Sequence, residues 1–383
     1  MNVTRQPGIY IHIPFCKAKC GYCDFYSIED SSLSSAFLDA LIQEIKLFTA
    51  DLSAMPKFDT IYLGGGTPSL LPIENLSQIL SALPKYCKLD PDCEITIEVN
   101  PGTINLTQLK KYRELGINRI SLGIQSFIDK DLQVLGRIHT VANAVKTIED
   151  SKTGGFNNIN LDLIFALPHH TLNNWEYTIR KALSFDPEHL SIYNLTFEPG
   201  TPFYQKLRQG RFVKYNDVTE GKYYNTAHSI LAEAGYLHYE VSNYAKSEEL
   251  VSRHNYKYWS HTPYVGFGPS AHSFWDNYRW SNVASVRGYI NQLQRDTLPR
   301  SMTEKLKNSQ LIFENIFLAL RTYQGLNLNS FKNRFGMEFI RTYRTEVDKL
   351  INLKLAEIQN DCFRLTEKGM LVCDEILPAF AAD

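Results

Sequence analysis

The sequence lacks the features that mark membrane, exported or nucleic-acid-binding proteins. No stretch of its 383 residues approaches the run of about 18 apolar residues that a membrane-spanning helix requires. Residues 1–7 contain no apolar signal core, so we expect a protein that is not exported and that works in the cytoplasm. The net charge of −1 gives no overall attraction to nucleic acid or to an anionic membrane surface.

A disulfide framework is also missing. The chain has seven cysteines, an odd number, and four of them are scattered at Cys87, Cys93, Cys362 and Cys373. Cys87 and Cys93 flank a turn and are near enough in sequence to pair, but the pattern as a whole favours a reduced protein. The other three cysteines lie close together near the N-terminus.

Cys16, Cys20 and Cys23 have the spacing C-x3-C-x2-C and directly follow the apolar run Ile9–Phe15, which is typical of a strand. Thiolates are soft ligands that favour iron–sulfur clusters or zinc. Three thiolates leave one iron of a four-iron cubane open for chemistry. A structural zinc needs a fourth ligand, and Asp24 is a poor one. The spacing therefore favours a cluster over zinc, and over three buried free thiols.

Strand-like and helix-like runs alternate through the first 236 residues. The alternation predicts six β-then-α units, which form a parallel sheet with right-handed crossovers. Six units are too few for a complete eight-fold barrel, so we expect an α/β fold with a partial six-unit (βα)6 barrel. The predicted strands are Ile9–Ile13, Thr60–Leu63, Glu94–Val99, Arg119–Ile124, Asn158–Ala166 and His189–Leu195, and the predicted helices are Ser34–Phe48, Glu74–Leu83, Leu106–Leu115, Asp129–Glu149, Leu172–Leu183 and Asp217–Ala234.

The rest of the chain changes character twice. Residues 237–303 are dense in His, Tyr and Trp with glycine-rich turns, and we expect them to pack on the barrel of residues 1–236. Residues 304–383 are typical of a small winged-helix-like domain. Its arginines lie among acidic residues, which favours a docking or lid role over nucleic-acid binding. Its predicted elements are the helices Gln310–Ala319, Leu328–Phe335, Phe339–Leu350 and Lys368–Ile376 and the strands Leu355–Ile358 and Cys362–Leu365.

Each predicted barrel strand runs into a polar or glycine-rich motif, and ligand-binding residues of parallel barrels lie at these carboxyl ends. Residues 64–66 are three glycines, which let a ligand approach the backbone, although a tight turn explains them as well. Glu98 can accept hydrogen bonds from ribose hydroxyls, or it is a solvated charge. Arg137 can bind a carboxylate in bidentate geometry. Asp162 is predicted to point into the barrel, where an unpaired carboxylate would be costly.

The cysteine spacing, with Tyr22 beside it, resembles the signature of the radical S-adenosylmethionine (SAM) superfamily. This resemblance implies a 4Fe–4S cluster whose fourth iron is chelated by the amino and carboxylate groups of SAM. Nearly the whole chain resembles the family of oxygen-independent coproporphyrinogen III oxidase, HemN, through stretches such as Gly64-Gly-Gly-Thr-Pro-Ser and Gly123-Ile-Gln-Ser-Phe. That resemblance implies cluster ligands Cys16, Cys20 and Cys23, and SAM or cluster contacts from Tyr10, Tyr22, Gly65, Gly66, Thr67, Glu98, Gln125, Arg137, Asp162 and Thr196.

Two departures from the oxidase resemble the HemW branch of the family, the heme chaperones. Phe25 occupies the position of the oxidase's fourth cysteine, and only nine residues precede Tyr10 where the oxidase has a long arm. The motif His254-Asn-x-x-Tyr258-Trp259 also resembles a motif of that branch that is associated with heme binding.

His254 is therefore our candidate heme ligand, because neutral imidazole binds heme iron well. Its aromatic neighbours can stack on the porphyrin. The alternative is that His254 hydrogen-bonds within the protein and the aromatic side chains simply pack. His261 and His272 stay open as other ligands.

We expect a heme chaperone of the radical SAM type that binds heme and passes it to an acceptor protein, with a 4Fe–4S cluster and SAM as its other cofactors. Two enzymes are alternatives. One is the oxidase, which decarboxylates coproporphyrinogen III through a 5′-deoxyadenosyl radical, and the other is a radical SAM methyltransferase acting on a tetrapyrrole. The sequence leaves open whether the protein is an enzyme, which protein accepts the heme, and whether the chain forms a homodimer.

Overall fold

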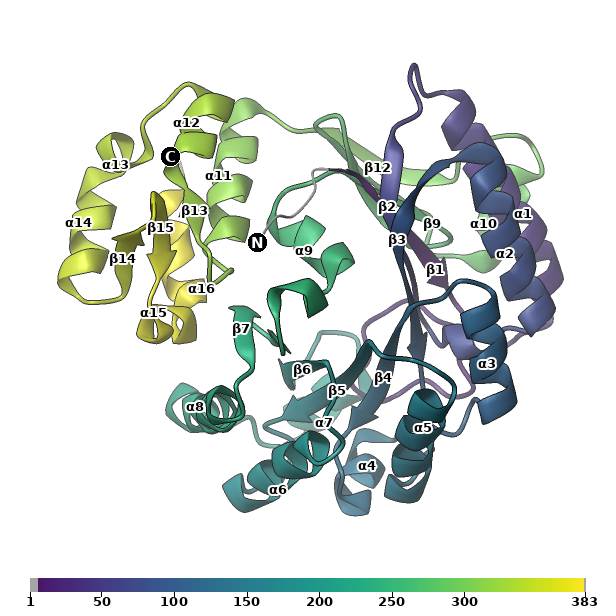
Figure 1. The fold of residues 1–383 in the computed structure, drawn as a ribbon, viewed down its shortest axis with the longest axis horizontal. Helices are drawn as coiled ribbons and strands as arrows, with labels where there is room; N and C mark the ends of the chain where they lie inside the picture. Colours follow the sequence, from purple (N-terminus) through teal and green to yellow (C-terminus); the bar gives the residue numbers. More distant parts are fainter. Residues whose placement is uncertain (1–5, 382–383) are drawn as a thin grey trace.

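The computed structural model describes residues 6–381, and its larger part is an α/β unit built on one long sheet (Figure 1). The six predicted β-then-α units are confirmed, and their strands pair in parallel, side by side in chain order. The strands are β1 (Gly8–Ile13), β2 (Lys57–Gly65), β3 (Lys88–Val99), β4 (Arg119–Gln125), β5 (Ile159–Phe165) and β6 (His189–Asn194). The helices are α1 (Ser34–Ala50), α2 (Ile73–Tyr86), α3 (Leu106–Glu114), α4 (Asp129–Leu135), α5 (Val141–Thr153), α6 (Leu172–Leu183), α7 (Pro202–Arg208) and α8 (Asp217–Glu233).

The predicted helix Asp129–Glu149 is wrong in one respect, because the structure has two helices there. Gly136 adopts a left-handed conformation with φ of 73° and ends α4, a backbone geometry that glycine tolerates best. Thr140 then begins α5, since its side chain accepts a hydrogen bond from the backbone N–H of Asn143. The break matters for the site, because it places Arg137 in the loop between the two helices.

Residues 237–303 extend the sheet at both edges. β8 (Asn243–Ala245) and β7 (Leu237–Glu240) continue it beyond β6, and β9 (Tyr264–Phe267) pairs in parallel with β1. The sequence indicated tight turns here but no strands, because each of these strands is only three or four residues long. Outside β9 lie β10 (His272–Trp275), β11 (Tyr278–Asn282) and β12 (Arg300–Lys305), and the region also holds α9 (Arg253–Trp259) and α10 (Val286–Leu293).

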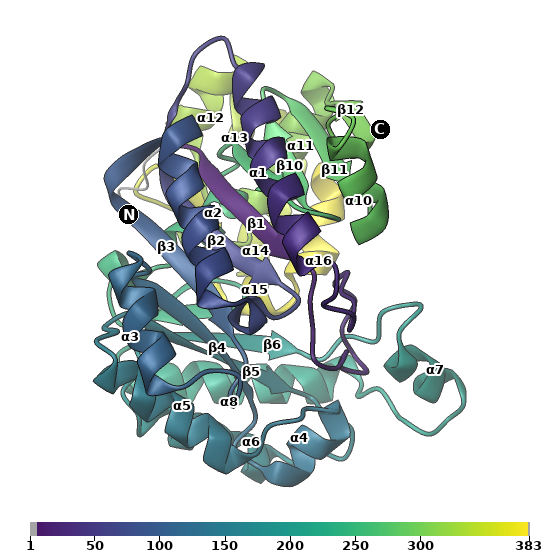
Figure 2. The same cartoon turned by 90° about the vertical axis from the view of Figure 1, so that its right-hand side faces the viewer.

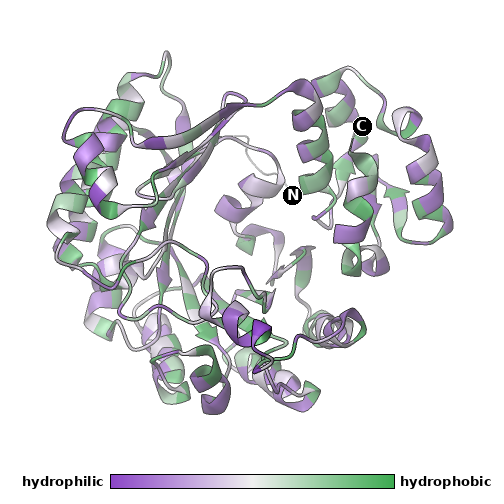
Figure 3. Cartoon of the chain, turned by 180° about the vertical axis from the view of Figure 1, so that it is seen from behind, coloured by the Kyte–Doolittle hydropathy of each residue, from purple (hydrophilic) through white to green (hydrophobic). Residues whose placement is uncertain are grey.

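The sheet therefore has twelve strands that begin at β12 and finish at β7, and it does not close into a barrel. Side chains alternate between its two faces. On β1, Ile9, Ile11 and Ile13 are fully buried in the hydrophobic core that α1 and α2 cover (Figure 2), whereas Tyr10 and His12 lie on the opposite face. We call this second, polar face the inner face. The covering helices carry hydrophobic and hydrophilic residues together, as amphipathic elements require (Figure 3).

Helix α9 closes the inner face at the N-terminal ends of the strands. The Glu94 carboxylate accepts the backbone N–H groups of Arg253 and His254 at 3.1 and 3.0 Å, so it holds a negative charge at the start of the helix. Lys257 Nζ lies 2.6 Å from Asp59 Oδ1, and the two side chains are 0% and 2% exposed. This buried ion pair fixes α9 against β2.

The C-terminal domain has its own hydrophobic core and a three-stranded sheet, and it lies beside α9 and β7 (Figure 1). The predicted hairpin is confirmed, but the predicted helices Phe339–Leu350 and Lys368–Ile376 are each broken in two, at Tyr343 and Val372. The elements are α11 (Asn308–Ala319), β13 (Leu326–Asn327), α12 (Leu328–Phe335), α13 (Phe339–Thr342), α14 (Arg344–Asn352), β14 (Ala356–Gln359), β15 (Cys362–Leu365), α15 (Glu367–Leu371) and α16 (Cys373–Ile376).

Backbone hydrogen bonds tie this domain to the edge of the large sheet. The N–H of Val241 donates to the carbonyl of Arg321 at 3.1 Å, and the N–H of Tyr323 donates to the carbonyl of Tyr239 at 3.0 Å. The domain therefore docks on the end of β7.

Across residues 6–381, no helix has the length and apolar character needed to cross a membrane. The prediction that the N-terminus has no apolar signal core concerns residues 1–5 in large part, and these lie outside the described residues.

The role of α9 can be tested by replacing Lys257 with methionine. We expect Lys257→Met to lower the free energy of unfolding by about 3–5 kcal/mol, because it removes the cation from a buried ion pair. Urea unfolding measures this. The control is Lys146→Met, which breaks the surface pair with Asp150 and should cost less than about 1 kcal/mol. Equal losses in the two variants would contradict the role assigned to the buried pair.

Candidate functional site

A cavity of about 620 Å³ opens on the inner face at the carboxyl ends of the parallel strands. Twelve of the residues singled out from the sequence line it, and they come from the parallel strands themselves or from the loops that follow them. These residues are Cys16, Cys20, Cys23, Tyr22, Gly65, Gly66, Thr67, Glu98, Gln125, Arg137, Asp162 and Thr196.

The three cysteines lie in the loop between β1 and α1, on one side of this cavity. The loop is closed at its base, because the N–H of Cys16 donates to the carbonyl of Ile28 at 2.9 Å. All three thiols are free, and so are the four scattered cysteines, so Cys87 and Cys93 form no disulfide. Burial raises the pKa of the Cys23 thiol.

Donors directed at sulfur fit a set of thiolate ligands. Arg137 Nη1 donates to Cys20 Sγ at 3.6 Å, and Thr67 Oγ1 donates to Cys16 Sγ at 3.6 Å. Hydrogen bonds to the sulfurs are one of the ways in which a protein tunes an iron–sulfur cluster. Within residues 6–381, no three His, Cys, Asp or Glu side chains converge on a point as the ligands of a single ion do. A cubane does not need such convergence, since each thiolate binds a different iron.

The glycines at the end of β2 are required by the packing of the protein itself. Gly65 has φ of 110°, and a Cβ on it would lie 2.6 Å from the His12 ring. A Cβ on Gly66 would lie 2.7 Å from the carbonyl oxygen of Phe15. A side chain at residue 65 would thus collide with β1, and one at residue 66 would collide with the start of the cysteine loop. This packing holds the backbone at residues 65 and 66 against the loop and leaves it as part of the cavity wall.

Glu98 lines the cavity and is held by two hydrogen-bond donors. Tyr62 Oη donates to Glu98 Oε1 at 2.9 Å, and the N–H of Gly65 donates to Oε2 at 3.1 Å. Burial, and then the nearby Asp162 carboxylate, raise the pKa of Glu98 to about 7. The side chain can therefore change its charge close to neutral pH.

Asp162 points to the inner face, as the sequence predicted, and its carboxylate is paired. Ser121 Oγ donates to Oδ2 at 3.1 Å and Asn160 Nδ2 donates to Oδ1 at 2.8 Å. Burial nevertheless raises the pKa of Asp162. Gln125 has a positive φ of 67°, and its buried Oε1 has no hydrogen-bond partner among the described residues. An orphaned acceptor on a strained backbone is typical of a ligand site.

Asn100 lines the same cavity and was missed by the sequence analysis. Its side chain accepts from Arg137 Nη2 at 2.5 Å and donates to Thr67 Oγ1 at 2.9 Å. It therefore positions the two side chains that donate to the cysteine sulfurs. The motif Glu98-Val-Asn-Pro at the end of β3 could have revealed it, because it follows a strand like the residues that were found. Tyr62 and Tyr193 also line the cavity and were not predicted.

Tyr10 and His254 do not line this cavity. The Tyr10 hydroxyl is hydrogen-bonded to His12 Nδ1 at 3.1 Å, and its ring lies beside Tyr62. His254 is 1% exposed, with Nδ1 at 2.8 Å from Thr60 Oγ1 and Nε2 at 2.9 Å from the hydroxyl of Tyr258. Burial, and then the charges of Lys257 and Arg119, lower the pKa of His254 to about 3.

The other histidines that were left open also lie away from the cavity. His261 is buried, stacks on Phe274 with ring centroids 4.4 Å apart and lies 3.5 Å from Glu314. His272 is exposed on β10.

The fold and the cysteine loop are those of radical SAM proteins, and comparisons with known families agree. The model of the radical SAM superfamily matches residues 10–182, and the model of the HemN C-terminal domain matches residues 306–372. Coproporphyrinogen III oxidase HemN from Escherichia coli shares the fold, with a TM-score of 0.83 and 23% identity over 100% of this chain and 92% of that one.

Curated relatives show to which family of radical SAM proteins the chain belongs. A heme chaperone HemW from Bacillus subtilis is 35% identical over 98% of this chain and 99% of its own length. Proteins of the same name from Lactococcus lactis and Haemophilus influenzae are 33% and 32% identical over 100% and 98% of this chain, and over 99% and 98% of their own lengths. The chain therefore belongs to the HemW family of the radical SAM superfamily. Membership in the superfamily implies a 4Fe–4S cluster and SAM.

The unusual pKa of Glu98 predicts a pH-dependent effect of Glu98→Gln on stability. In the unfolded chain Glu98 ionises near pH 4.5, but in the folded chain near pH 7. Between these values only the unfolded state loses its proton, so rising pH destabilises the wild-type protein. The uncharged glutamine removes this loss. We expect the variant to gain about 1–3 kcal/mol over wild type from pH 5 to pH 8, measured by urea unfolding without added SAM.

Glu114→Gln, at an exposed position near the end of α3, is the matched control for Glu98→Gln and should show no such trend. A stability difference that stays constant from pH 5 to pH 8 would argue against an ionisation of Glu98 near pH 7.

Proposed function

We propose that this protein is a cytoplasmic heme chaperone that binds heme and transfers it to an acceptor protein. The observation that carries the proposal is the similarity to relatives named heme chaperone HemW, which extends over both the sheet and the C-terminal domain. Similarity confined to the radical SAM core would support only a shared cofactor.

We also propose that Cys16, Cys20 and Cys23 bind three irons of a 4Fe–4S cluster and that SAM occupies the rest of the cavity. When bound, the cluster and SAM supply one-electron chemistry at the open iron. The residues of this chain orient them. Arg137 donates toward the Cys20 sulfur, and Glu98 offers carboxylate oxygens to the hydroxyl groups of a ligand.

An oxidase activity is the second candidate, because the fold matches HemN over the entire chain. Against it stands Phe25, at the position where the resemblance places the fourth cysteine of the oxidase. The Phe25 side chain lines the cavity and is 66% exposed. A phenyl ring cannot bind iron or exchange a proton, so the mouth of the cavity lacks the group that the oxidase has there.

Heme binding is tested by a hemin titration of anaerobically reconstituted protein, followed by visible absorbance. We expect saturable binding with one heme per chain, because a chaperone must hold its cargo specifically. A heat-unfolded sample of the same protein is the control for nonspecific association. Absorbance that rises without saturation, as in the unfolded sample, would refute the proposed function.

The oxidase is tested separately with coproporphyrinogen III, SAM and a reductant under anaerobic conditions. We expect no decarboxylated product, measured by chromatography, while HemN from Escherichia coli forms it under the same conditions. Catalytic turnover by this chain would show that it is an oxidase. It would also show that Phe25 does not prevent this activity.

A further inference from the structure

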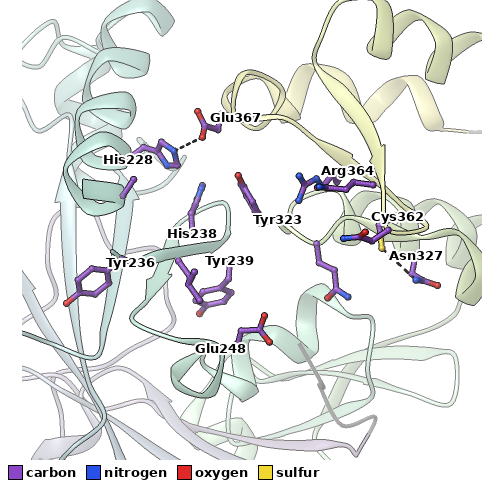
Figure 4. A pocket seen from close by; sticks show the side chains of 15 residues that line it. His228, Tyr236, His238, Tyr239, Glu248, Tyr323, Asn327, Cys362, Arg364 and Glu367 are labelled. Atoms are coloured by element: carbon purple, nitrogen blue, oxygen red, sulfur yellow. Dashed lines mark hydrogen bonds and ion pairs between the residues drawn. The ribbon is translucent and has the colours of Figure 1, made fainter. Parts of the chain in front are cut away.

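A second cavity lies where the C-terminal domain meets the edge of the large sheet (Figure 4). Its volume is about 550 Å³, within the range of about 300–1,000 Å³ that is typical of small-molecule sites. One wall comes from α8 and β7, and the other from the strands of the C-terminal domain. The two walls cannot drift apart freely, because the backbone hydrogen bonds at Val241 and Tyr323 join them.

The cavity contains flat side chains and two imidazoles. His238 stacks on Tyr244 with ring centroids 4.3 Å apart and an interplanar angle of 11°. The ring of His228 lies edge-on to His238 at 5.2 Å, and Tyr323 lies 6.1 Å from His238. Figure 4 shows His228 and His238 on one side, Arg364 on the other and Tyr323 between them. Flat aromatic surfaces of this kind suit a flat aromatic ligand.

His228 has a nitrogen that can be released for a metal. Its Nε2 lies 3.2 Å from Glu367 Oε1, and the Glu367 side chain is 65% exposed. A contact with an exposed carboxylate contributes little free energy, so Glu367 can move away from Nε2 at small cost. Nδ1 is buried and has no hydrogen-bond partner among the described residues, so no other bond opposes a change of tautomer.

His254 lacks this freedom. Its two ring nitrogens are bonded to Thr60 and Tyr258 inside the fold, and α9 is fixed by the buried pair of Lys257 and Asp59. To bind an iron atom, His254 would have to lose one of these hydrogen bonds, and its side chain, which is 1% exposed, would have to become accessible. The structure thus favours the second alternative of the sequence analysis, in which His254 is a hydrogen-bonded residue of the core.

The charges of the cavity wall distinguish one end from the other. Arg364 donates from Nε and Nη2 to one carboxylate oxygen of Glu357. These two bonds use two of the five N–H donors of the Arg364 guanidinium. Its guanidinium lies 5.3 Å over the Tyr323 ring. Glu248 and Glu367 also line the cavity, and their charges repel an anion placed beside them. A ligand carboxylate is therefore directed toward Arg364, which can bind it in charge-assisted geometry.

We propose that heme binds in this second cavity, with His228 Nε2 as an axial ligand of the iron, His238 and Tyr323 against the porphyrin, and Arg364 paired with a propionate. This inference rests on the proposed function and names the site at which it is carried out. Heme bound here contacts the C-terminal domain and the sheet together. The docking role expected for that domain would then include one wall of the heme site.

The ligand is tested by hemin titration of the full-length, cluster-reconstituted protein. We expect His228→Gly to weaken heme binding by about tenfold or more, as disturbed metal ligation does, and to shift the Soret maximum. Added imidazole should restore the wild-type spectrum, because it fills the space of the lost side chain. His272→Gly is the matched control, since His272 is exposed and does not line the cavity, and it should keep the wild-type affinity.

The cavity is tested independently by filling it. Ala232 on α8 is exposed and lines the cavity, so Ala232→Trp should abolish saturable binding without disturbing the core. Ala234→Trp is the control two residues away, because Ala234 is exposed but does not line the cavity. Comparison of these two tryptophan variants shows whether heme binds in the second cavity, even if His228→Gly does not fold.

The outcomes separate the site from the function. If wild-type protein binds heme saturably and both Ala232→Trp and His228→Gly bind equally well, the site is wrong and the proposed function stands. If imidazole fails to rescue a folded His228→Gly variant that has lost affinity, His228 is not the ligand. If wild-type protein shows no saturable binding, the proposed function fails and the site fails with it.

Discussion

The polar character of the inner sheet face is the constraint on which the rest of the structure depends. Buried polar groups cost free energy unless they are hydrogen-bonded, so most of the inward side chains are paired across neighbouring strands. Ser121 and Asn160 donate to Asp162, for example. Arg119 is an exception: its buried guanidinium has no hydrogen-bond partner among residues 6–381, and its charge stabilises the nearby Asp162 carboxylate. Helix α9 closes one end of this face, and the other end stays open as the cavity beside the cysteines.

The parallel core and its open end were predictable because local pattern determines both. Period-two alternation identifies a strand, and the carboxyl ends of parallel strands meet at one edge, so Cys16, Glu98 and Asp162 were expected to converge and do. The short edge strands β7, β8 and β9 were missed, since three or four residues carry too little periodicity to identify a strand. The break at Gly136 was missed because the apolar pattern continues across it.

The second cavity was beyond the reach of sequence reasoning for a different reason. His228 and Arg364 lie far apart in the chain and meet only because the C-terminal domain docks on the end of β7. No local pattern records such a meeting. His254 does lie in a local pattern, but the pattern is ambiguous. A histidine in an aromatic-rich motif is typical both of a heme ligand and of a packed core. Only its partners, Thr60 and Tyr258, distinguish the two.

A chain of hydrogen bonds joins the two cavities. Tyr239 lines the second cavity, and its hydroxyl is 2.7 Å from His189 Nε2, whereas His189 Nδ1 is 2.6 Å from Asn160 Oδ1. Burial lowers the pKa of His189 well below its usual value, so the ring is neutral and has one donor and one acceptor nitrogen. Nδ1 faces an amide oxygen and must carry the proton, so Nε2 accepts from Tyr239. Asn160 donates in turn to Asp162, which lines the first cavity. Every donor in the chain therefore points toward the Asp162 carboxylate, and one continuous run of hydrogen bonds leads from the second cavity to the first.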